Sequence, residues 1–104
     1  MKVETTHRID AGRRDAQGRY QYYYEYDLYE FSDGAVKLLA RSYVEEPDEV
    51  HFLNIGDGTT QRMLTDADLR LPLAQSAARH LAEFGKKRIN WLSERGYEPF
   101  SVQE

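Results

Sequence analysis

The chain has 104 residues, the size of a single domain, and a formal net charge of −4 at pH 7. It contains no cysteine, which excludes a disulfide framework and thiol chemistry. No apolar run approaches the length of a membrane span, and the first residues lack the apolar core of a signal peptide. We therefore expect a cytoplasmic protein with no membrane partner.

Residues 1–64 alternate between apolar and polar side chains in short runs separated by turn residues, a pattern typical of antiparallel strands. Residues 10–19 hold two glycines and three arginines and predict a polar loop. A glycine-rich turn follows the fourth run. The predicted strands are residues 2–9, 20–31, 35–45 and 50–55, with 59–64 as a short fifth strand.

Six of the eight tyrosines lie between Tyr20 and Phe31. Alternate side chains of a strand point to opposite faces, so this strand carries aromatic area on both sides. We predict a three-residue hairpin loop, 32–34, which pairs Phe31 with Ala35. We prefer this register because it keeps apolar and charged side chains on separate faces of the sheet. This register places one tyrosine set, Tyr22, Tyr24 and Tyr26, in the core.

The same register leaves the opposite face of the sheet open to solvent. The residues predicted to bind a partner there are Tyr23, Tyr29, Phe31, Leu39, Arg41 and Tyr43. Glu25 and Asp27 lie on this face too, with Glu25 paired across the strands with Arg41.

Residues 65–96 predict a helical region. Thr65 and Asp68 have the spacing of a capping box, which predicts that a short helical turn over 66–70 begins there. Pro72 suits the first turn of a long helix that runs to about residue 95, and Gly96 is typical of the position just after a helix. Small and apolar side chains recur at helical spacing, which predicts one long helix across one face of the sheet. Residues 97–104 form a tail that folds back. The fold class is therefore α+β, with a meander sheet of four or five strands in one domain, 1–104.

The open aromatic face predicts a non-enzymatic module that binds a protein partner or forms a homodimer, because Tyr and Arg are enriched in binding hot spots. The alternative is a small-molecule-binding protein or a small enzyme, with a pocket beside the tyrosines and Glu25, Asp27 and His51 as polar groups. The sequence identifies no catalytic residue.

Other classes of site lack support in the sequence. The three histidines have no spacing typical of metal ligands, so we expect no metal site and no cofactor. The turn at residues 55–60 lacks the lysine of a phosphate-binding loop. The acidic net charge, with Glu25 and Asp27 among the tyrosines, argues against nucleic acid as a partner.

Overall fold

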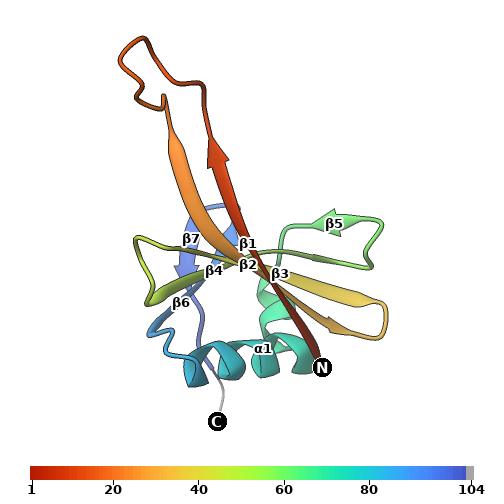
Figure 1. The fold of residues 1–104 in the computed structure, drawn as a ribbon. Helices are drawn as coiled ribbons and strands as arrows, with labels where there is room; N and C mark the ends of the chain where they lie inside the picture. The colour runs from red at the N-terminus through yellow and green to blue at the C-terminus, as the bar shows by residue number, and fades with distance from the viewer. Residues whose placement is uncertain (103–104) are drawn as a thin grey trace.

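The structure is a computed structural model and describes residues 1–102. One sheet and one α-helix form an α+β domain (Figure 1). The helices are the short 3-10 helix η1 (Asp66–Arg70) and α1 (Pro72–Glu83). The strands are β1 (Lys2–Ala11), β2 (Tyr23–Asp33), β3 (Val36–Tyr43), β4 (Glu49–Gly56), β5 (Gln61–Arg62), β6 (Arg88–Ser93) and β7 (Gly96–Pro99).

The sheet has the strand order β1-β2-β3-β4-β6-β7, and β5 pairs with β4 off this path. Strands β1 to β4 form the antiparallel meander that the sequence predicts. The chain then crosses over through α1 and returns as β6, parallel to β4. A parallel neighbour needs such a crossover, usually through a helix. The prediction of four or five strands was therefore too low, because it omitted β6 and β7.

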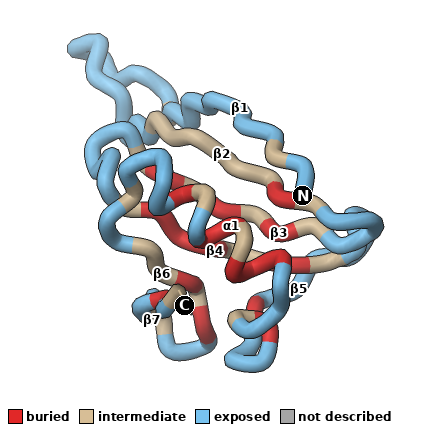
Figure 2. The backbone as a smooth tube through the Cα atoms, turned by 90° about the horizontal axis from the view of Figure 1, so that it is seen from below, coloured by how far each residue is buried: buried red, intermediate tan, exposed pale blue. Residues whose placement is uncertain are grey.

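The helix α1 covers one face of the sheet, and the core lies between them (Figures 1 and 2). Small residues on the helix, Ala74, Ala77 and Ala78, are completely buried and let it approach the sheet closely. The sheet contributes the largest completely buried aromatic side chains of the core, Phe31 and Phe52.

The prediction of one long helix was wrong, because the helix ends at Glu83. Gly85 has a positive φ of 92°, the left-handed conformation that favours glycine. Its N–H donates to Ala82, and the N–H of Lys86 donates to Leu81, which together form a Schellman motif. This motif stops the helix and turns the chain into β6. Gly96, predicted to follow the helix, instead begins β7.

The predicted register of the β2–β3 hairpin was also wrong. The loop is the two-residue turn of Gly34 and Ala35, with φ of 61° at Gly34, so Phe31 pairs with Leu38. The predicted buried side of β3 was correct, since Leu38 and Ala40 are completely buried. The shift brings the other side of β2 under the helix, because a change of register by an odd number exchanges the two faces.

Beyond the end of β3, strands β1 and β2 continue as a two-stranded arm (Figure 1). We define the arm as residues 9–25, with a tip formed by residues 12–22. Figure 2 shows it as an almost uninterrupted exposed segment that projects from the body of the domain. The arm makes the molecule elongated, with extents of 51 × 30 × 28 Å.

The region predicted as a C-terminal tail contains most of β7 and then folds back. Phe100 is buried against Phe52, with ring centroids 5.2 Å apart. Residues 103 and 104 of the predicted tail lie outside the described part of the chain. Within residues 1–102, no helix is long and apolar enough to cross a membrane.

Candidate functional site

A continuous aromatic surface lies on the side of the sheet opposite α1. We call it the open face and define it by residues from β2, β3 and β7. Its core comes from the β2–β3 register, in which Tyr26 lies opposite Tyr43 and Leu28 lies opposite Arg41. Its members are Tyr24, Tyr26, Leu28, Leu39, Arg41, Tyr43 and Tyr97.

Arg41 lies at the centre of the open face. Its guanidinium carbon is 4.8 Å from the ring centroid of Tyr43 and 5.8 Å from that of Tyr26. Its Nη2 donates to the hydroxyl of Tyr97 across 3.3 Å. Stacking of this kind fixes the planar guanidinium and still leaves N–H groups for a further acceptor. The Nε atom of Arg41 is buried and has no hydrogen-bond partner in the described part of the chain.

The tyrosine rings connect Arg41 to the arm through a series of contacts. The rings of Tyr26 and Tyr43 meet edge to face with centroids 5.8 Å apart. Tyr43 contacts Tyr24 at 5.9 Å, and Tyr24 contacts Tyr22 at 6.0 Å. These separations are typical of favourable aromatic pairs. The open face therefore continues onto the arm without a break.

His51 lies opposite Arg41 in the β3–β4 register, at the border of the open face. Its ring packs on Tyr97 with centroids 4.1 Å apart, and its Nε2 lies 3.2 Å from Glu49. Burial lowers the pKa of His51, because desolvation disfavours the charged imidazolium. The predicted polar group His51 is therefore a largely buried, neutral ring beside the aromatic surface.

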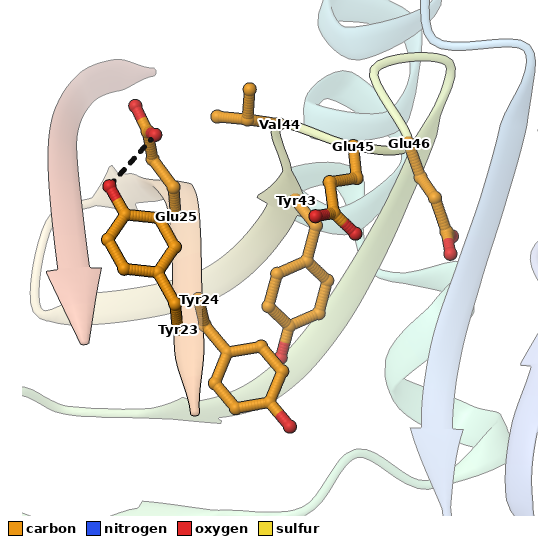
Figure 3. Close-up of a pocket in the computed structure, with 7 residues that line it drawn as sticks. All are labelled: Tyr23, Tyr24, Glu25, Tyr43, Val44, Glu45 and Glu46. Carbon is orange, nitrogen blue, oxygen red and sulfur yellow. Dashed lines mark hydrogen bonds between the residues drawn. The ribbon is translucent and has the colours of Figure 1, made fainter. Parts of the chain in front are cut away.

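A pocket of about 280 Å³ lies at the base of the arm, between β2 and the chain that leaves β3 (Figure 3). The N–H of Val44 donates to the carbonyl of Glu25 across 2.9 Å, and this bond holds the two segments together. Aromatic and acidic side chains share the wall of this arm-base pocket. The lining residues are Tyr23, Tyr24, Glu25, Tyr43, Val44, Glu45 and Glu46.

Two walls of the arm-base pocket each combine tyrosine rings with a carboxylate. Tyr24 and Tyr43 present their rings side by side, and Glu45 lies close to Tyr43 (Figure 3). Tyr23 points to the other side of β2, where its hydroxyl lies 3.4 Å from Glu25 (Figure 3). Rings together with carboxylates form an environment that suits a cationic group.

Glu25 does not pair with Arg41 as predicted, because the register brings Glu25 and Asp27 beside His7 of β1. His7 Nδ1 lies 2.7 Å from Asp27, and His7 Nε2 lies 2.7 Å from Glu25. Carboxylates only accept hydrogen bonds, so both bonds require the doubly protonated imidazolium. The hydrogen bonds to Asp27 and Glu25 accordingly raise the pKa of His7. This ion pair ties β1 to β2 where the arm begins.

The structure divides the predicted site residues among three places. Leu39, Arg41 and Tyr43 lie on the open face, and Tyr23 lines the arm-base pocket. Tyr29 is half-buried against the core on the helix side of β2, so its prediction on the open face was wrong. Phe31 is completely buried beneath the helix, so its prediction as a surface residue was wrong.

Three tyrosines of the open face were missed by the sequence analysis. Tyr24 and Tyr26 were assigned to the core because of the incorrect hairpin register. Tyr97 was placed in a tail after a helix, although it lies on β7. Gly85 was the available signal, since a glycine just after the last turn is typical of a helix end.

Among residues 1–102, no group of three or more His, Asp or Glu side chains is arranged to hold a metal ion. Comparisons with protein-family models, with curated proteins and with solved structures found no match to this chain.

Proposed function

We propose that the chain is a non-enzymatic protein-interaction module that binds its partner through the open face. One observation carries this proposal: a connected series of tyrosines runs from the arm to Arg41 on the side of the sheet that the helix leaves uncovered. Tyr and Arg dominate binding hot spots, because they combine a large contact area with hydrogen-bonding groups.

Exposure of the aromatic side chains supports the same conclusion. Tyr24 is 52 % exposed, and Tyr22, which continues the open face onto the arm, is 47 % exposed. Contiguous apolar patches on soluble domains commonly mark interaction sites. The rings stand on paired strands, which limits the entropy lost on binding.

A photoreactive phenylalanine analogue placed at position 24 tests this proposal in living cells of the native host. We expect irradiation to produce a defined crosslinked protein species. Phe84 provides the matched control, since it is an aromatic side chain 72 % exposed at the end of α1, outside the open face. The same analogue at position 84 should give no crosslink. Equal crosslinking at both positions, or none at position 24, would contradict the proposal.

A second candidate function is small-molecule binding in the arm-base pocket. The specific observation is the combination of Tyr24 and Tyr43 rings with Glu45 around a pocket of about 280 Å³. This chemistry favours a small organic cation. Titration with tetramethylammonium, followed by NMR, should shift the signals of Tyr24 and Tyr43. A control titration with sodium sulfate should leave these signals unchanged. Equal shifts in the two titrations would exclude this candidate.

A further inference from the structure

Outside its base, where Val44 donates to Glu25 and Tyr43 contacts Tyr24, the arm projects away from the body of the domain (Figure 1). Beyond the end of β3 it is a two-stranded ribbon, and such a ribbon alone is marginally stable in water. Its large side chains remain in solvent: Ile9 is 58 % exposed and Tyr20 44 %. An ordered ribbon with uncovered rings is typical of a segment that packs against another molecule.

One edge of the arm also has free backbone groups. Glu25 points its carbonyl toward β3, where Val44 donates to it. Tyr23 lies two residues earlier on the same strand, so its N–H and C=O point to the same side. The β2–β3 pairing extends only to Tyr26 and Tyr43, which leaves Tyr23 beyond the covered part of the edge. The two backbone groups of Tyr23 can therefore form hydrogen bonds with another molecule.

The tip and the base of the arm carry opposite charge. The tip contains Arg13, Arg14 and Arg19 with a single acid, Asp15. Arg14 stacks on Tyr20, at 4.9 Å, within the tip. Arg13 and Arg19 are exposed and make no ion pair among residues 1–102.

The base of the arm is the acidic counterpart of this tip. The wall of the arm-base pocket contains three carboxylates beside its tyrosine rings, from Glu25, Glu45 and Glu46, and that of Glu25 is already paired with His7. Glu45 is exposed and makes no ion pair in the described chain. Arginine side chains pair with carboxylates and stack on aromatic rings, so this pocket complements the tip in both respects.

We infer that a second copy of the chain binds at the arm. The two chains dock reciprocally, with the basic tip of each arm on the arm-base pocket of the other chain. This inference rests on the proposed protein-binding role of the surface. The two chains are related by a two-fold axis, which sets the tip of each arm beside the pocket of the other chain. A two-fold axis makes both contacts identical, as isologous dimers require.

Two charge-reversal variants, one of the tip and one of the pocket, test this arrangement. Their association is measured by analytical ultracentrifugation of the full chain. The variant Arg13→Glu/Arg19→Glu has an acidic tip facing an acidic pocket. The variant Glu45→Arg/Glu46→Arg has a basic tip facing a basic pocket. We expect the wild type to be a dimer that weakens as salt increases, since the contact is electrostatic. We expect about a 100-fold weaker association in each variant alone.

The equimolar mixture of the two variants is the decisive sample. In a mixed dimer, each acidic tip meets a basic pocket and each basic tip meets an acidic one, so association should return to within about tenfold of the wild type. The control variant Arg70→Glu/Arg95→Glu changes the net charge as much as Arg13→Glu/Arg19→Glu does, and it should still dimerise. Circular dichroism should show all variants folded.

Two results would overturn this reciprocal docking of tip and pocket. One is a wild type that stays monomeric at every concentration. The other is a dimer that the tip and pocket variants leave as strong as the control. Either result leaves the proposed function separately testable, because a crosslink from position 24 to a different protein would support partner binding without self-association.

Discussion

Phe31 on β2 lies directly opposite Leu38 on β3, and both side chains are completely buried beneath α1. This one pair fixes which side of β2 forms the core. The alternate residues Tyr24 and Tyr26 are consequently directed to the opposite face, where Arg41 and Tyr43 meet them. The location of the proposed binding surface therefore follows from a packing contact on the other side of the sheet.

The opposite roles of two aromatic residues on β2 give the first prediction. Phe31→Ala should lower the free energy of unfolding by about 3–5 kcal/mol, because it leaves a cavity in a closed core. Tyr24→Ala should lower it by about 0.5 kcal/mol, since the ring is 52 % exposed. Urea denaturation of the two variants measures both values. Comparable losses would mean that the faces of β2 are wrongly assigned.

The ion pair at the start of the arm should make the arm sensitive to pH. The hydrogen bonds to Asp27 and Glu25 raise the pKa of His7, so they stabilise the arm fully below the ordinary pKa of 6.5. That stabilisation is lost as the pH rises through the higher pKa of folded His7. NMR titration should show the elevated pKa, and the protection of the arm amides against exchange, relative to their intrinsic rates at each pH, should fall above it.

Asp27→Asn serves as the test variant for this pH dependence. It removes the carboxylate charge that faces His7 Nδ1, so the pKa of His7 should fall toward 6.5. Asp33→Asn, an exposed change at the other end of β2, is the matched control and should leave His7 unaffected. An unchanged His7 pKa in Asp27→Asn would refute the assignment.

The capping box before η1 should contribute to stability through Asp68. Arg62 donates two hydrogen bonds to this buried carboxylate and Thr65 donates from its N–H, which lowers the pKa of Asp68 to about 2. Asp68→Asn should cost about 2 kcal/mol at neutral pH. This contribution is complete above the ordinary pKa of 3.8 and disappears as the pH falls through about 2.

Thermal unfolding over this pH range measures the effect of Asp68→Asn. Asp66→Asn changes an exposed acid in the same turn and should leave the melting temperature nearly unchanged. A deficit for Asp68→Asn that stayed constant down to pH 2 would rule out the charged contact as its cause.

The end of α1 supplies a prediction about the backbone. Gly85→Ala should destabilise the domain by about 1 kcal/mol, because alanine is strained at the φ of 92° that the Schellman motif requires. A Cβ atom there would meet no other atom within 4 Å, so crowding adds nothing. Gly85→Asn should cost less than alanine, since asparagine tolerates this conformation better. Chemical denaturation compares the two, and an equal or reversed order would contradict the explanation.

Much of the local structure was predictable, because it depends on short-range signals. The alternation of residues 2–9 and the runs at 35–45 and 50–55 correspond to β1, β3 and β4. The turn at 66–70 is η1, and Pro72 begins α1. Thr65 and Asp68 form the predicted capping box. Each of these signals acts over a few residues and needs no distant partner.

The periodicity of residues 72–95 led to the wrong prediction for the second half of this segment. Apolar spacing alone does not separate a long helix from a short helix followed by a strand. Ile89 fits the helical stripe, yet it lies on β6 beside Val50 of β4. The parallel pairing with β4 decides this conformation, and β4 is distant in sequence.

The sequence by itself determined the α+β class, the first four strands and the presence of a tyrosine-rich surface on the sheet. Only the tertiary structure decided which tyrosines form that surface. Side chains alternate along a strand, so a strand with aromatic rings on both sides does not itself determine which side becomes buried. The helix and the pairing of Phe31 with Leu38 settle the choice, because together they bury one side of β2. Tyr24 and Tyr26 thereby remain on the open face with Arg41.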